Sequence, residues 1–197
     1  YRIADARVIM TFGADFLDTF ISPERFSSDW ARSRKVEDRG DKMSSTIVFE
    51  PRMTMTGGSA DRRFVVRQGH LINVAGAITH LVAKEMKAAS AIIDQVKGYD
   101  PNAVSTQTGI KVEDLVALSK RLVQHAGSCV VFGGGILGSA ELDKMALLLN
   151  YVLNNIGQTV VLDGTDRCAR GFSVLLDLIT QINNCLLYTS PSPRDSD

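Results

Sequence analysis

The sequence contains little cysteine and has no excess charge of either sign. Cys129, Cys168 and Cys185 form no Cys-x-x-Cys pair, which argues against a zinc site, an iron–sulfur cluster or a disulfide framework within this chain. The chain has 22 basic and 22 acidic residues, so no basic excess points to nucleic acid. No apolar run is long enough for a direct membrane span. The remaining composition, 45% hydrophobic and 22% charged, is typical of a globular domain with a buried core.

Apolar runs of strand length alternate with helical patterns along the chain. Strands are predicted at Val8–Phe12, Thr46–Phe49, Arg63–Arg67, Ser128–Phe132 and Thr159–Leu162. Helices are predicted from Pro23 to Arg34 or Lys35, and at Leu71–Met86, Val112–His125 and Ala140–Leu153. Such alternation predicts parallel strands joined by right-handed crossovers. The expected fold class is α/β, a Rossmann-like parallel sheet flanked by helices.

Two further segments have less regular patterns. Gly98–Gly109 contains Pro101 and several Ser, Thr and Asn residues, so it is predicted to be a loop and the best internal boundary. Asp163–Gly171 is also predicted to be a loop. Phe172–Ile182 is predicted to be helical or mixed.

A block of polar residues follows the second predicted strand. It reads Glu50-Pro51-Arg52-Met53-Thr54-Met55-Thr56-Gly57-Gly58-Ser59-Ala60-Asp61. Open α/β sheets present nucleotide-like ligands at the carboxyl ends of their strands. Glu50 is therefore expected to accept from a ribose hydroxyl, Arg52 to pair with a phosphate, and Thr54, Thr56 and Gly57–Gly58 to supply further donors. The alternative is a polar surface turn.

Two glycine-containing turns follow other predicted strands. Gly133–Gly135 comes after the strand that ends at Phe132, but it is not a Gly-x-Gly-x-x-Gly run and no Gly-Lys-Ser/Thr follows. This favours a tight turn over a phosphate loop. Gly13 leads the first strand into Asp15 in a similar way. We expect the loops near Gly13 and Glu50 to meet at one ligand-facing edge of the sheet.

Four segments in a fixed order carry a family resemblance over roughly residues 4–162. They are Ala4–Ile9 running to Gly13-Ala14-Asp15-Phe16; the acid-Pro-Arg-x-Thr block at Glu50 with Thr56 and Ala60-Asp61; Thr108-Gly109-Ile110 before Glu113; and Leu149–Gly157. Together they resemble the molybdopterin oxidoreductase family, the large-subunit type related to dimethyl sulfoxide reductase and formate dehydrogenase.

The resemblance implies two Rossmann-like lobes with a molybdopterin guanine dinucleotide held between them, a two-lobe fold of which this chain is an incomplete part. Residues 1–109 would form a cofactor-binding lobe and residues 110–184 the return segment of a second α/β lobe. The cofactor-binding residues it implies are Gly13, Asp15, Glu50, Arg52, Thr54, Thr56, Asp61 and Gly69. It assigns no catalytic residue and no metal ligand within the chain.

One departure from the family pattern narrows the resemblance. Active members show Pro-Gly-Thr-Asp after the third strand, whose Asp grips guanine, whereas this chain reads Arg67-Gln68-Gly69-His70. Only the glycine is kept. With Gly13–Leu17 and the Thr-Gly-x-x-Ala-Asp form at Thr56–Asp61, the chain most resembles the molybdopterin-like subunits of alternative complex III and menaquinone reductase complexes. Such subunits keep the fold and are thought not to bind molybdenum.

This narrower resemblance implies an oxidoreductase subunit of a respiratory electron-transfer complex. Iron–sulfur clusters would lie outside this chain. The partners would be iron–sulfur and membrane-anchor subunits, and the location would be the periplasmic face of the membrane. Two alternatives stay open: a non-catalytic scaffold of the same fold without molybdenum, and an unrelated Rossmann-like nucleotide-binding domain.

The two ends of the sequence need separate treatment. The chain starts at Tyr1 without an initiator Met and is interpreted as an internal piece of a longer protein. Cys185–Asp195 resembles a translated sequencing adapter, a transposon end followed by its primer. Residues 185–197 are therefore interpreted as an assembly artefact and excluded from fold reasoning. The alternative is a genuine Ser/Pro-rich linker.

We expect re-sequencing of the source locus to replace the peptide beyond Asn184 with unrelated codons, because an adapter has no counterpart in the native gene. The measurement is a read that crosses the Asn184 codon on unamplified DNA. Native codons that still encode Cys185–Asp195 would contradict the artefact interpretation.

Overall fold

The computed structural model of the chain describes residues 1–35, 43–135, 138–162 and 180. Tyr1–Leu162 form one compact unit. Its described residues contain a four-stranded sheet in the order β3-β2-β1-β4. The strands are β1 (Val8–Phe12), β2 (Ser45–Glu50), β3 (Arg62–Val65) and β4 (Cys129–Gly133), and every neighbouring pair is parallel. The predicted α/β class with a parallel sheet flanked by helices is confirmed.

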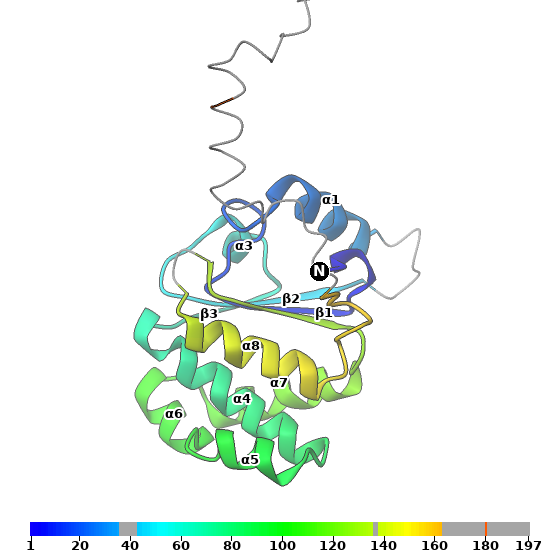
Figure 1. The fold of residues 1–197 in the computed structure, drawn as a ribbon. Helices are drawn as coiled ribbons and strands as arrows, with labels where there is room; N and C mark the ends of the chain where they lie inside the picture. The colour runs from blue at the N-terminus through cyan, green and yellow to red at the C-terminus, as the bar shows by residue number, and fades with distance from the viewer. Residues whose placement is uncertain (36–42, 136–137, 163–179, 181–197) are drawn as a thin grey trace, which may run out of the picture. The chain divides into compact units, whose positions relative to one another are not determined.

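Helices cover both faces of the sheet. Helix α1 (Pro23–Ser33) lies on one face, and α4 (Leu71–Glu85), α7 (Val112–Gln124) and α8 (Ala140–Val152) lie on the other (Figure 1). The shorter helices are α3 (Met55–Gly58), α5 (Ser90–Val96) and α6 (Pro101–Thr108), with 3₁₀ turns η1 (Ile3–Asp5) and η2 (Gln68–His70). The four longer helices were all predicted, with ends that differ by one or two residues.

The central strand β1 is buried on both of its faces. Val8, Met10 and Phe12 pack into the core shared with α4, α7 and α8. Ile9 packs into the second core, which includes Phe26 of α1. Successive side chains of a strand point to opposite faces, so a strand covered on both sides is an unbroken apolar run. This is why the apolar runs in the sequence predicted the strands well.

Side chains that follow β4 in the sequence cover its outer edge. Asn150 Nδ2 donates to the Val131 carbonyl at 2.8 Å, and Asn150 Oδ1 accepts from the Val131 amide at 3.1 Å. Asn155 Oδ1 accepts from the Cys129 amide at 3.2 Å, and Asn155 Nδ2 donates to Asn150 Oδ1 at 3.0 Å. The Thr159 hydroxyl donates to the Cys129 carbonyl. We call Asn150, Asn155 and Thr159 the edge clamp, because they satisfy backbone groups that a further strand would otherwise pair.

The predicted loop at Gly98–Gly109 is wrong, because most of it is helix α6. Asp100 caps this helix by accepting from the Ala103 amide at 3.0 Å, and Pro101 occupies its first position. Gly109, with φ of 75°, ends it in the left-handed conformation. An Asp-Pro start and a glycine stop are ordinary helix signals, but the Ser, Thr and Asn content obscured them.

The predicted strand at Thr159–Leu162 is also wrong. Of this segment only Val160 is paired, in an isolated parallel bridge with Ile156, and the side chain of Thr159 bonds to the Cys129 carbonyl. The predictions for 163–171, for 172–182 apart from Thr180, and for 185–197 lie outside the described residues.

The expected boundary near Gly109 falls inside the unit Tyr1–Leu162. Strand β4, which follows that boundary, pairs with β1 in the same sheet. The assignment of residues 110–184 to a second lobe concerns a longer two-lobe protein and stays a prediction.

The edge clamp predicts a large loss of stability for Asn150→Ala in the full-length protein. The substitution leaves the buried amide and carbonyl of Val131 without their side-chain partners, which costs about 2–4 kcal/mol. Urea unfolding measures the loss. Asn102→Ala, at an exposed position of α6, is the matched control and should stay within about 0.5 kcal/mol of wild type. Equal stability of the two variants would show that the clamp does not stabilise β4.

Candidate functional site

The loops that follow β1 and β2 meet at the carboxyl edge of the sheet. The two strands are parallel, with Phe12 beside Phe49. Beyond them, Asp15 Oδ1 accepts from the Thr56 amide at 3.0 Å and from the Thr56 hydroxyl at 2.6 Å. The Leu17 amide donates to the same hydroxyl oxygen at 3.1 Å. The expected meeting of the two loops is therefore confirmed.

Gly13 gives the first of these loops its direction. Its φ of 81° lies in the left-handed region, which residues with a side chain rarely adopt. The Gly13 amide donates to the Phe49 carbonyl at 2.9 Å, so the turn begins while the chain is still attached to β2. The Thr11 hydroxyl donates to the Ala14 carbonyl at 2.7 Å and closes the turn. This geometry brings Asp15 to Thr56.

Glu50 is buried and bonded within the chain. Its Oε2 accepts from the Thr54 hydroxyl at 2.7 Å, its Oε1 accepts from the Thr54 amide at 3.3 Å, and Arg63 Nε forms an ion pair with Oε1. Thr54 also caps α3 by accepting from the Gly57 amide at 3.0 Å. A Cβ on Gly57 would lie 1.8 Å from Glu50 Oε1, so this position requires glycine. Glu50 braces the loop that carries α3.

A hollow of about 590 Å³ opens between the two loops. Asp15, Asp18, Thr19, Arg52, Met53, Thr54, Met55, Gly58 and Ser59 line it. Arg52 is exposed and has no hydrogen bond or ion pair among the described residues. Met53 and Met55 are 71% and 63% exposed. The described lining therefore combines one cation without a hydrogen bond or ion pair, two carboxylates, three hydroxyls and two methionine side chains.

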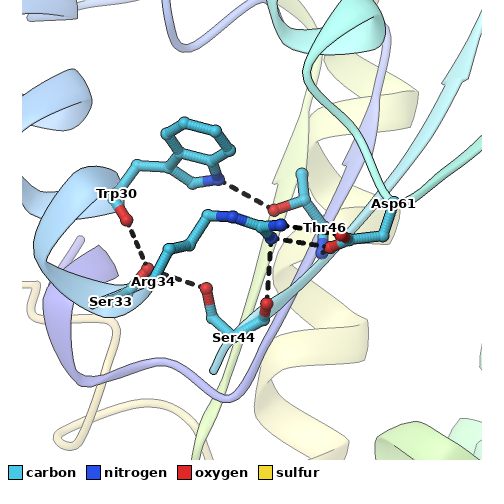
Figure 2. A network of polar contacts seen from close by, with 6 residues as sticks. All are labelled: Trp30, Ser33, Arg34, Ser44, Thr46 and Asp61. Atoms are coloured by element: carbon cyan, nitrogen blue, oxygen red, sulfur yellow. Dashed lines mark hydrogen bonds and ion pairs between the residues drawn. The ribbon is translucent and has the colours of Figure 1, made fainter. Parts of the chain in front are cut away.

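Asp61 lies at the opposite, amino edge of the sheet, directly before β3. Figure 2 shows it joined to Arg34, whose guanidinium reaches both carboxylate oxygens at 2.8 Å. The Thr46 amide donates to Asp61 Oδ2 at 2.7 Å, and the Thr46 hydroxyl accepts from Trp30 Nε1 at 2.9 Å. Arg34 also stacks over the Trp30 ring. Asp61 thus joins α1, β2 and β3, and the structure does not bring it to Asp15 and Glu50.

Electrostatics favour the charged form of Asp61. Burial alone would raise the pKa of its carboxyl group. The hydrogen bonds from Arg34 and the Thr46 amide, with the charges of Arg34 and Arg121, outweigh that and hold the pKa below its ordinary value.

Gly69 lies in η2, past the carboxyl end of β3. It borders a second hollow, of about 370 Å³, against the start of α8. The other lining residues are Gln68, Ile72, Gly138, Ser139 and Leu142. No carboxylate is among these lining residues, so the hollow lacks the acidic group that the family pattern has beside this glycine.

The glycines at the end of β4, Gly133 and Gly134, pack closely against α8. A Cβ on Gly133 would lie 2.8 Å from Ala146 Cβ and 2.9 Å from the Leu142 carbonyl oxygen. A Cβ on Gly134 would lie 2.1 Å from Asp143 Oδ1. These contacts favour the tight-turn interpretation, because the space beside both glycines is filled by α8.

Sequence reasoning missed Asp18, Thr19 and Ser59 as lining residues of the 590 Å³ hollow. Asp18 and Thr19 follow β1 closely, as Arg52 and Thr54 follow β2. The same carboxyl-end rule that selected Glu50 would have found them.

In the described ranges, no three His, Cys, Asp or Glu side chains lie together in a way that could hold a metal ion. None of the described helices is both long and apolar enough to cross a bilayer.

Comparisons with known proteins point to an oxidoreductase relative and an established fold. No family model matches the chain. The chain is 28% identical over 114 residues to the probable oxidoreductase YoaE of Bacillus subtilis (strain 168), a match that covers 52% of this chain and 16% of the relative. The fold of this chain is similar to that of acetylene hydratase from Pelobacter acetylenicus, with a TM-score of 0.53 and 14% identity. The similarity covers 84% of this chain and 23% of acetylene hydratase. The chain spans less than a quarter of the length of either protein.

The lowered pKa of Asp61 predicts an acid-dependent contribution to stability. Because the folded-state pKa lies below the unfolded-state value, the contribution is fully present above the unfolded-state value of about pH 4 and is lost as pH falls through the folded-state pKa. We expect Asp61→Asn to lower the melting temperature at pH 7 and to have a smaller effect at pH 3.

Thermal unfolding of the full-length protein between pH 7 and pH 3 measures this. Asp94→Asn is the control, because the Asp94–Lys97 pair is exposed and such pairs contribute little. A loss for Asp61→Asn that is the same at both pH values would rule out the ion pair as its cause.

Proposed function

We propose that this chain is part of a molybdopterin-type oxidoreductase subunit of a respiratory electron-transfer complex, and that its carboxyl edge binds a pterin dinucleotide. The observation that carries the proposal is the contact between Asp15 and Thr56, 41 residues apart. It joins the two loops that the family resemblance assigns to the cofactor. It does so at the edge where parallel α/β sheets bind nucleotides.

The side chains of the hollow, together with Glu50, which bonds to Thr54 but does not line the hollow, divide into supporting and ligand-facing groups. Asp15, Glu50 and Thr54 have their hydrogen bonds within the chain, so they hold the loops in place. Arg52 has no partner among the described residues and suits a phosphate, which a guanidinium binds through paired hydrogen bonds. Thr19 and Ser59 offer hydroxyls to a ribose or a phosphate. When bound, the molybdopterin supplies the redox step, and the protein supplies binding and orientation.

The oxidoreductase part of the proposal has support from the relative named a probable oxidoreductase. Since the chain spans 16% of that relative, the activity of the whole protein is part of the proposal. We extend the proposal to iron–sulfur and membrane-anchor subunits as partners and to the periplasmic face of the membrane as the location. Both follow from the sequence resemblance to alternative complex III and menaquinone reductase subunits.

A second candidate function is a scaffold of the same fold that holds cluster-bearing partners and carries no molybdenum. The hollow at Gly69 favours it, because none of the side chains lining that hollow is a carboxylate that could grip guanine. Molybdenum and tungsten analysis of the full-length protein separates the two functions. Stoichiometric metal favours catalysis, and its absence together with absence of pterin favours the scaffold.

Arg52→Ala should lower the pterin nucleotide content of the full-length protein. Loss of one charge-assisted contact weakens binding about tenfold. The content is measured by fluorescence of the extracted, oxidised pterin. Lys84→Ala, an exposed cation on α4, is the control and should keep the wild-type content. Because Arg52 has no hydrogen bond or ion pair within the described chain, the melting temperature should not change.

Glu50→Ala should lower both pterin content and melting temperature, since Glu50 braces the loop from inside. If Arg52→Ala and Glu50→Ala both hold as much pterin nucleotide as wild type, the cofactor assignment fails.

A further inference from the structure

A basic hollow lies at the amino edge of the sheet, away from the candidate site. It measures about 350 Å³ and lies between the starts of β2 and β3 and the last turns of α7. Four side chains that carry or can carry positive charge line it, Arg62, Lys120, Arg121 and His125, and Ile47 and Leu118 form part of its wall. We call it the amino-edge hollow.

The acids near the amino-edge hollow are already paired with arginines. Asp114 accepts from Arg62 at 2.7 Å. Asp61 accepts from Arg34 through both of its oxygens. Lys120 and Arg121 are exposed and have no hydrogen bond or ion pair among the described residues. The lining residues of the hollow include no acid and carry a net positive charge, and the charge of Arg121 also acts on Asp61.

The end of helix α7 does not account for this arrangement. Basic side chains often lie near the last carbonyls of a helix. Here the Leu122 carbonyl accepts from the His125 amide at 3.1 Å, and the His125 carbonyl accepts from the Ser128 amide at 2.8 Å. The carbonyl groups of Leu122 and His125 thus already have backbone partners. The cations instead share a hollow with residues of β2 and β3.

The pKa of His125 is lowered by its surroundings. Burial is the largest cause that lowers the pKa of His125, and the charges of Arg121 and Arg7 lower it further. A neutral imidazole still has one ring N–H to donate.

We propose that the amino-edge hollow is a binding site for a small, multiply charged oxyanion of the phosphate type. Lys120 and Arg121 supply the charge, and the ring of His125 supplies a further donor. A guanidinium beside an ammonium suits an anion with several oxygens, which takes paired hydrogen bonds from the first and a point charge from the second. The hollow has no aromatic side chain other than His125 among its lining residues, so we assign it an anion without a stacked base.

Isothermal titration of pyrophosphate into the full-length protein at low ionic strength tests the proposal. Wild type should show saturable binding. Lys120→Ala/Arg121→Ala should bind at least about tenfold more weakly, as expected for two lost charge-assisted contacts. Lys84→Ala/Lys144→Ala removes the same charge from exposed positions and should stay within about twofold of wild type. Arg52→Ala removes the cation of the candidate site, so pyrophosphate binding that this variant keeps is assigned to the amino-edge hollow.

Three results would overturn the proposal: no saturable binding to wild type, equal loss in both double variants, or loss in Arg52→Ala with Lys120→Ala/Arg121→Ala unaffected. Lys120→Gln/Arg121→Gln, which keeps long side chains on α7, is the second variant if the alanine pair alters the circular dichroism spectrum. Retained binding in that variant would overturn the proposal as well.

Discussion

Burial of β1 on both faces is the constraint on which the rest of the structure depends. Val8, Ile9, Met10 and Phe12 are fully buried, and the strand pairs with β2 on one side and β4 on the other. A strand in that position cannot slip by one residue, because each side chain would move to the opposite face. Its parallel neighbours then end at a common edge. The candidate site lies at the carboxyl edge of the sheet, and the amino-edge hollow lies at the other end of the strands.

The loops of the candidate site are held mainly by bonds within the protein. The hydrogen bond between Thr56 and Asp15 joins the two loops. The second loop is braced by the hydrogen bond from Thr54 to Glu50 and the ion pair between Arg63 and Glu50. Loops that are already ordered lose less conformational freedom when a ligand binds. Two of the carboxylates chosen from the sequence as ligand contacts thus act on the chain itself. Arg52, from the same block, has no such bond within the part of the chain that the structure describes.

The edge of β4 shows how one sequence motif can serve stability. The segment Leu149–Gly157 helped to carry the family resemblance, and its two buried asparagines satisfy the amide and carbonyl of Val131 and the amide of Cys129. An unpaired buried backbone group is costly. Side-chain amides, with a donor and an acceptor side by side, can replace a neighbouring strand there. In this chain the segment therefore closes the outer edge of β4.

The sequence by itself determined the α/β class, the four strands and the long helices, because apolar runs and helical periodicity follow directly from burial. It also selected the Gly13 and Glu50 loops. The sequence did not predict α6, because the surrounding Ser, Thr and Asn residues obscured its Asp100 cap and its Gly109 end. It also assigned Asp61 and Glu50 to the same site, since both belong to one polar block. Only the tertiary structure decided which acids face their own chain, that Asp61 lies at the far edge, and that Lys120 and Arg121 share a hollow with β2 and β3. Those outcomes depend on contacts between residues distant in the chain, and local sequence patterns do not determine such contacts.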